Sequence, residues 1–71
     1  MVSIALLTVS DTRNIKNDDS GNYLLLEIEN SGHKILERMI CKDDIYLIRK
    51  YISDWISNPE IDVIITTGGT G

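Results

Sequence analysis

The sequence is poor in the features that mark secreted and membrane-spanning proteins. Its single cysteine, Cys41, cannot form a disulfide within the chain, and a lone thiol is typical of a reducing compartment. The first residues lack the basic segment and the small-residue cleavage site of a signal peptide. The longest apolar run, around residues 4–7, is far too short to span a bilayer. We therefore expect a cytoplasmic protein that does not interact with membranes.

Positive charge is also scarce. Seven Lys and Arg residues stand against eleven Asp and Glu residues, which gives a formal net charge of −4, and the basic residues are scattered. A nucleic-acid groove needs clustered Lys and Arg to neutralise phosphates, so the sequence argues against nucleic-acid partners. A small anion is still possible, because backbone N–H groups can bind phosphate without basic side chains.

What is present is the composition of a globular domain. With 42% hydrophobic and 25% charged residues and no low-complexity stretch, the 71 residues fit one small domain or part of one. Residues 2–9 form a near-continuous apolar run, typical of a strand buried on both faces. Residues 21–31 predict a helix, which Asp19 or Ser20 is placed to cap and Gly32 to end.

The second half of the chain repeats the alternation of strand and helix. Residues 34–40 predict a strand that suits a sheet edge, because it contains Glu37 and Arg38. A longer helix follows, capped by Asp43 or Asp44, and Asn58-Pro59 ends it. Residues 62–67 predict a third, apolar strand. In the helix that follows Asp43-Asp44, the side chains expected to form the buried stripe are Ile45, Ile48, Ile52, Trp55 and Ile56.

The element order is strand-helix-strand-helix-strand, which predicts an α/β three-layer sandwich with a mainly parallel sheet. Right-handed crossovers make the strands parallel, and a polar second strand at the edge gives the strand order 2-1-3. The two helices then cover opposite faces. Open α/β sheets bind ligands at the carboxyl edge where the chain reverses direction, between strands one and three. Three loops meet there, at residues 10–20, 41–44 and 68–71.

The loop Gly68-Gly69-Thr70-Gly71 is the first candidate site. Glycines allow backbone N–H groups to approach phosphate oxygens, and Thr70 adds a hydroxyl. The alternative is a tight strand-to-helix turn that binds nothing. The loop is not a P-loop, because the Lys-Ser/Thr pair and its spacing are missing.

Two acidic segments end the other strands. Ser10-Asp11 could contact a ligand or form an Asx-type turn. Asp43-Asp44 could hold Mg²⁺, which takes one or two carboxylates alongside substrate phosphates, or could cap the following helix. The residues by themselves leave both choices open.

Five segments, in this order and spacing, resemble the MoaB/MogA family of molybdenum cofactor biosynthesis. They are Thr8-Val-Ser-Asp-Thr-Arg13, Asp19-Ser-Gly21, Gly32-His33, Ile40-Cys-Lys-Asp-Asp44 and Thr66-Thr-Gly-Gly-Thr-Gly71. The stretch 32–56 is most similar to the bacterial MoaB branch. The resemblance implies that residues 1–71 are the N-terminal part of a single molybdopterin-binding domain, whose usual length is about 150 residues.

The resemblance also implies an activity. Active family members adenylylate the phosphate of molybdopterin with ATP and Mg²⁺. Carried onto this chain, it assigns Asp43 to catalysis and to Mg²⁺, and Ser10 and Asp11 to the pterin phosphate. The remaining phosphate-binding residues that it implies are Gly68, Gly69, Thr70 and Gly71. For the complete protein it implies a homo-oligomer, a trimer or a hexamer.

The chain departs from the family pattern in two respects. Lys42 stands where many members have proline, and the second essential aspartate of the family would follow Gly71. We therefore expect this chain alone to be inactive as an adenylyltransferase. A non-catalytic member that binds or scaffolds the pterin is the alternative. A more remote one is an NAD(P)-binding sugar-nucleotide enzyme, because Thr67-Gly-Gly-Thr-Gly71 resembles its fingerprint, although that fingerprint follows a first strand.

Overall fold

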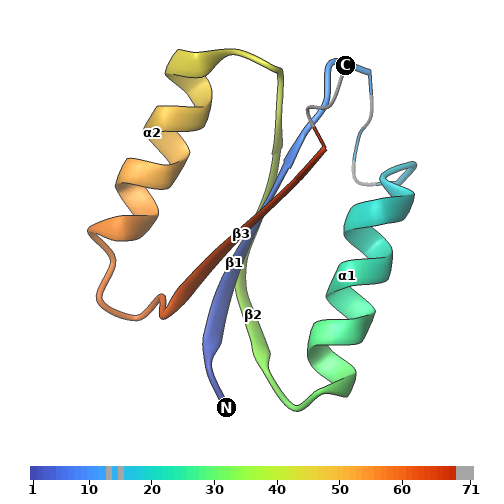
Figure 1. Cartoon of the computed structure of the whole chain (residues 1–71), viewed down its shortest axis with the longest axis vertical. Coiled ribbons are helices and arrows are strands. Elements are labelled where there is room, and N and C mark those ends of the chain that lie inside the picture. The colour runs from blue at the N-terminus through green and yellow to red at the C-terminus, as the bar shows by residue number, and fades with distance from the viewer. Residues whose placement is uncertain (13, 15, 69–71) are drawn as a thin grey trace.

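The computed structural model describes residues 1–12, 14 and 16–68. The order of elements is the predicted strand-helix-strand-helix-strand (Figure 1). The elements are β1 (Ser3–Val9), α1 (Asp19–Asn30), β2 (Lys34–Cys41), α2 (Ile45–Ile56) and β3 (Val63–Gly68). No helix in the described part of the chain is long and apolar enough to cross a membrane.

The sheet has the predicted topology. Its strand order is β2-β1-β3, and β1 pairs in parallel with both neighbours. The central position of β1 explains its composition, since Ile4 through Val9 are all buried between the two helical layers. The more polar β2 lies at an edge, as its charged residues indicated.

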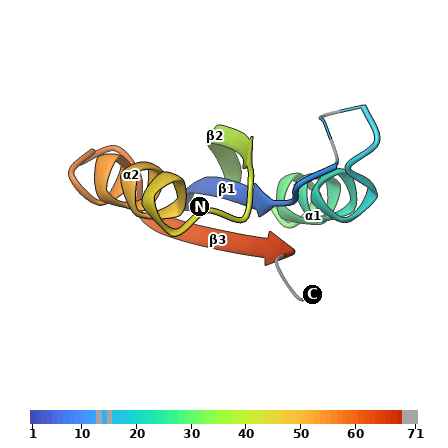
Figure 2. The same cartoon turned by 90° about the horizontal axis from the view of Figure 1, so that it is seen from above.

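The helices cover opposite faces of the sheet, which confirms the sandwich architecture (Figure 2). On the side of α2, alternate residues of β1 pack into one hydrophobic cluster with the helix. Its buried members are Ala5, Leu7, Val9, Cys41 and Trp55. On the other side, Ile28 is the buried hydrophobic residue of α1. Trp55 and Cys41 are thus both core residues.

One irregularity in β2 sets where its charged side chains point. The register shifts between Ile4 and Ala5, which pair with Ile35 and Glu37, so Leu36 is the extra residue of a β-bulge. Beyond this bulge Arg38 aligns with Leu6. Since Ala5 and Leu7 face α2, the intervening Leu6 faces α1, and aligned residues of parallel strands share a face. The bulge therefore turns Arg38 toward α1.

The N-cap of α1 differs from the prediction. Asp18 caps this helix, not Asp19 or Ser20, and its Oδ1 accepts a hydrogen bond from the backbone N–H of Gly21 at 3.1 Å. All three side chains can cap a helix, so local preference does not separate them. Contacts of Asp18 with the sheet select it, as described below.

The apolar face of α2 also differs from the prediction. Ile48, Ile52 and Trp55 pack on the sheet together with Tyr51, but Ile45 and Ile56 are 63% and 72% exposed. The two exposed isoleucines were therefore predicted wrongly as buried. At about 100° per residue they lie roughly 80° from the centre of the packed face, on its flank. The helix is rotated toward Tyr51, whose ring lies 6.1 Å from that of Trp55.

Candidate functional site at the carboxyl edge of the sheet

The three strands end at the same level. Val9, the last residue of β1, aligns with Cys41 on one side and Gly68 on the other. Ser10 then continues the ladder, because its backbone N–H donates to the carbonyl of Cys41 at 2.8 Å. The predicted residues Ser10, Asp11, Asp43 and Gly68 therefore lie at one edge of the sheet (Figure 1). Gly69, Thr70 and Gly71 lie outside the described residues.

Gly68 is required by the backbone at this edge. Its φ of +87° lies in the region that side-chain-bearing residues rarely adopt. A Cβ atom at this position would also collide with the carbonyl oxygen of Val9 and lie 3.3 Å from its carbon. The glycine thus lets β3 end tightly against β1. Its proposed contact with phosphate stays a prediction.

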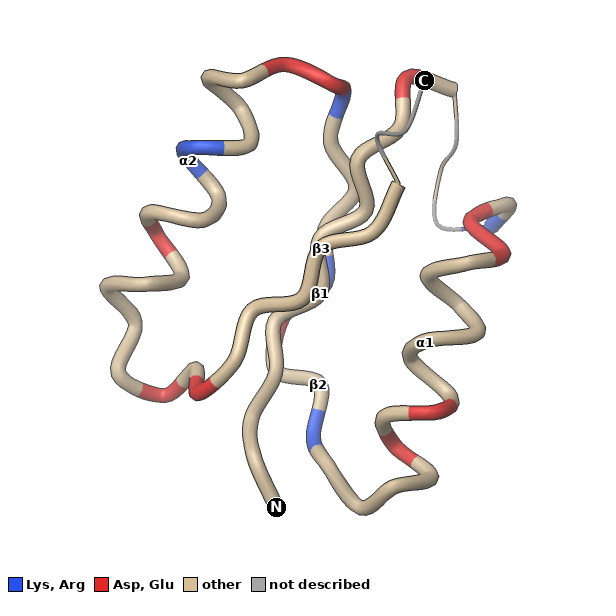
Figure 3. Tube along the Cα trace, viewed as in Figure 1, with Lys and Arg blue, Asp and Glu red and all other residues tan. Residues whose placement is uncertain are grey.

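The acidic residues at the edge have different partners. Oδ1 of Asp11 accepts the backbone N–H of Asp43 at 3.0 Å, which joins the loop after β1 to the turn before α2. Asp44 caps α2, since its Oδ1 accepts from the N–H groups of Tyr46 and Leu47 at 2.8 and 3.2 Å. The carboxylate of Asp43 is exposed and has no hydrogen-bond or ion-pair partner among the described residues. Figure 3 shows these acidic segments at the same end of the molecule.

Asp43 suits Mg²⁺ as a single protein ligand. Magnesium commonly takes one or two carboxylates and fills its remaining positions with water and substrate phosphates. Across residues 1–12, 14 and 16–68 there is no group of three or more His, Cys, Asp or Glu side chains that could hold a metal ion. The described residues therefore fit a metal that arrives with a phosphate ligand, and they do not form a closed metal cage.

Sequence reasoning did not single out Asp18, which has the most elaborate environment in the described chain. This carboxylate is fully buried. Its Oδ2 accepts from the hydroxyl of Thr8 at 2.6 Å and from Nη2 of Arg38 at 3.2 Å, and its Oδ1 accepts from Gly21. Asp18 therefore links β1, β2 and the start of α1, at the end of the loop that begins with Ser10.

The environment keeps Asp18 ionised. Burial by itself raises the pKa of this carboxyl group, but the hydrogen bonds from Thr8, Gly21 and Arg38, with the positive charge of Arg38, lower it further than burial raises it. Gly21 makes this possible, because a Cβ there would overlap the Asp18 carboxylate and lie 2.9 Å from the Thr8 hydroxyl. The sequence offered one signal for this buried ion pair: an acid, Asp18, three residues before a helical glycine, together with an arginine, Arg38, in a strand.

Cys41 is a buried thiol and does not belong to the exposed edge. Burial raises its pKa, and the negative charges of Asp43 and Asp44 raise it further. The thiol therefore stays protonated at neutral pH, which fits its packing in the core and argues against a nucleophile.

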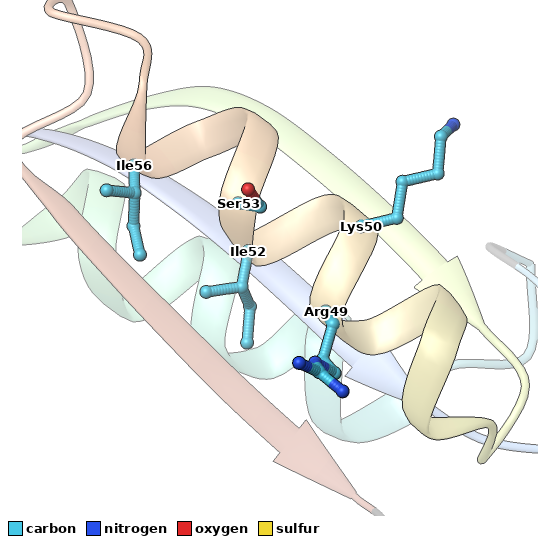
Figure 4. Close-up of a pocket in the computed structure, with 5 residues that line it drawn as sticks. All are labelled: Arg49, Lys50, Ile52, Ser53 and Ile56. Atoms are coloured by element: carbon cyan, nitrogen blue, oxygen red, sulfur yellow. The ribbon is translucent and has the colours of Figure 1, made fainter.

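A hollow of about 510 Å³ lies along α2 (Figure 4). It is lined by Arg49, Lys50, Ile52, Ser53 and Ile56. None of the predicted site residues that the structure describes lines it, so it offers no support for the site. Its apolar lining comes from Ile52 and Ile56.

Comparison with known proteins identifies the family. Residues 5–71 match the family model described as "Probable molybdopterin binding domain". The chain belongs to this family. The match confirms the resemblance drawn from the motifs, and it spans every residue predicted for the site.

Similar proteins and structures agree with this assignment. Molybdenum cofactor biosynthesis protein B of Escherichia coli (strain K12) is 41% identical over 68 residues, which are 96% of this chain and 40% of that protein. The protein of the same name from Staphylococcus carnosus (strain TM300) is 45% identical over 73 residues, 99% of this chain and 42% of the relative. A crystal structure of molybdenum cofactor biosynthesis protein B matches with a TM-score of 0.93 at 36% identity, over 99% of this chain and 44% of that one. The chain thus spans about two fifths of the length of these relatives.

Proposed function

We propose that this protein acts in molybdenum cofactor biosynthesis and binds molybdopterin at the carboxyl edge of its sheet. The observation that carries the proposal is the family match over residues 5–71, which includes all three loops of that edge. The phosphate of molybdopterin would lie against the glycine loop that begins at Gly68 and continues through residues 69–71. Ser10 would contribute from the end of β1. Backbone N–H groups in a glycine-rich turn suit such an anion in a chain with a net charge of −4.

The chemistry that we propose at this edge is adenylyl transfer. An oxygen of the molybdopterin phosphate would bond to the α-phosphorus of ATP, and pyrophosphate would leave. Such a transfer depends on positioning and charge neutralisation, and Asp43 is the edge carboxylate without a described partner. Mg²⁺ held by Asp43 and by phosphate oxygens would supply that neutralisation.

The remaining proposals concern the setting of the protein. The free, buried thiol of Cys41 fits a reducing cytoplasm. The resemblance to the family favours a homo-oligomer, a trimer or a hexamer. The ligand class is a small molecule, and the scattered basic residues speak against nucleic acid.

Equilibrium dialysis of the purified chain against increasing concentrations of molybdopterin tests the binding proposal. We expect saturable binding, and absence of binding by the wild-type chain would overturn the proposal. Adding ATP and Mg²⁺ to the complete protein then tests for adenylylated molybdopterin. Asp43→Asn should abolish formation of this product and weaken pterin binding when ATP and Mg²⁺ are present, while retaining pterin binding in their absence. Asp54→Asn, which changes an exposed acid on α2, should alter none of these. Binding without product in the complete wild-type protein would leave the pterin-binding role and remove adenylyl transfer.

A further inference from the structure

We propose that Asp11 is a positioning residue for Asp43 and does not itself contact the ligand. The inference rests on the proposed function and concerns how its acidic residue is held. Asp11 and Asp43 are 32 residues apart in the sequence, and one hydrogen bond joins them, from the backbone N–H of Asp43 to Oδ1 of Asp11. The acceptor thus comes from the loop after β1 and the donor from the turn before α2.

The hydrogen bond between Asp43 and Asp11 is the second of two successive hydrogen bonds that join these two segments. The N–H of Ser10 donates to the carbonyl of Cys41 at 2.8 Å, and Asp11 then accepts from Asp43 at 3.0 Å. Within the turn, the N–H of Asp44 donates to the carbonyl of Lys42 at 2.8 Å. The backbone on both sides of Asp43 is therefore fixed, and only its side chain projects without a described partner.

Charge gives the second reason. A carboxylate is an acceptor, and placed against a phosphate it would oppose the negative charge of the ligand. The same acceptor is well matched to a backbone N–H, which needs only an oxygen that can accept its hydrogen bond. Asp11 thus uses an oxygen to hold the turn, and Asp44 uses its carboxylate to cap α2. This division of roles leaves Asp43 to face the site.

A set of four variants tests the inference. Asp11→Asn keeps an Oδ1 acceptor without the charge, and Asp11→Ala removes the acceptor. Asp62→Asn and Asp62→Ala are the matched controls, because Oδ2 of Asp62 accepts the N–H of Ser3 at 2.9 Å at the opposite edge of the sheet. The readouts are the dissociation constant for molybdopterin in the presence of Mg²⁺ and an ATP analogue that cannot transfer its adenylyl group, and hydrogen exchange of the Asp43 amide.

We expect Asp11→Ala to weaken binding roughly three- to tenfold, as the loss of one hydrogen bond implies, and to speed exchange of the Asp43 amide. Asp11→Asn should stay within about twofold of the wild type in both readouts, since its amide oxygen still accepts. Neither Asp62 variant should change them. Binding as weak in Asp11→Asn as in Asp11→Ala would overturn the inference, because the charge itself would then be needed.

Unchanged affinity in Asp11→Ala would overturn the inference as well, because the turn would then not need this bond. In both cases wild-type binding would leave the proposed function standing. A wild-type chain that binds no molybdopterin would overturn the proposed function, and the inference with it. Asp11→Asn gives a decision even if Asp11→Ala fails to fold, because loss of affinity in the folded asparagine variant already contradicts the positioning role.

Discussion

At the scale of single residues, the balance of forces on Asp18 is the most consequential feature of the chain. Removing a carboxylate from water is costly, and three donors offset this cost. Arg38 contributes one contact through Nη2, while its buried Nε has no partner among the described residues. The pair is therefore sensitive to the loss of either member, since each would leave the other buried without its counter-charge.

This balance predicts an acid-sensitive fold. The pKa of Asp18 is lowered in the folded chain relative to about 3.9 in an unfolded one. The stability that Asp18 contributes is thus fully present above pH 4 to 5, and it is lost as the pH falls through the folded pKa. Urea unfolding between pH 6 and pH 3 measures this loss. Asp18→Asn should cost about 2 to 3 kcal/mol at pH 6 and flatten the acid dependence.

The control for this experiment is Asp54→Asn, which changes an exposed carboxylate on α2. It should leave the unfolding free energy and its acid dependence close to those of the wild type. An Asp18→Asn chain that loses stability with acid as steeply as the wild type would contradict the prediction, because another group would then carry the dependence.

At the scale of elements, the sequence predicted topology better than local detail. The apolar run of β1 and the charges in β2 placed one strand in the centre and the other at an edge, and crossover handedness supplied the rest. The cap of α1 was missed, because the choice among Asp18, Asp19 and Ser20 depends on Thr8 and Arg38, which are distant in sequence. The bulge at Leu36 leaves no local signal either.

The cap of α2 gives the prediction at this scale. Asp44 accepts from two N–H groups of the first turn, whereas the side chain of Asp43 accepts from no described residue. Asp44→Ala should therefore cost about 1 kcal/mol of unfolding free energy, measured by urea titration. Asp44→Asn should be nearly neutral, because asparagine caps equally well. Asp43→Ala should cost clearly less than Asp44→Ala, and equal costs would show that the two acids share the cap.

At the scale of the whole molecule, the position of the candidate site could be predicted from the fold. The hydrogen bonds within the site could not. Parallel strands of matched register must end together, so Ser10, Asp43 and Gly68 meet at one edge. The bond from Asp43 to Asp11 could not be foreseen, since an Asp after a strand accepts equally well from its own loop. Partner choice at this edge depends on how the loop after β1 and the turn before α2 come together, which residue patterns do not encode.

The exposed flank of α2 belongs to the same scale, because it depends on how the helix sits on the sheet. Ile45 and Ile56 are 63% and 72% exposed, and Ile56 also lines the hollow of Figure 4. Exposed apolar surface of this kind binds hydrophobic dyes and promotes association. The double variant Ile45→Lys/Ile56→Lys should therefore reduce both dye fluorescence and the concentration dependence of sedimentation.

Two single substitutions on α2 test whether Ile56 is exposed, as in the structure, or buried, as the periodicity predicted. Since Ile56 is largely in solvent, Ile56→Lys should change the unfolding free energy by no more than about 0.5 kcal/mol. Ile52 packs against the core cluster, so Ile52→Lys at the neighbouring turn should cost about 2 to 4 kcal/mol, through lost packing and a charge forced into an apolar contact. Urea titration of both variants measures the difference. Equal losses would restore the wider stripe that periodicity alone predicted, with Ile56 packed on the sheet in solution.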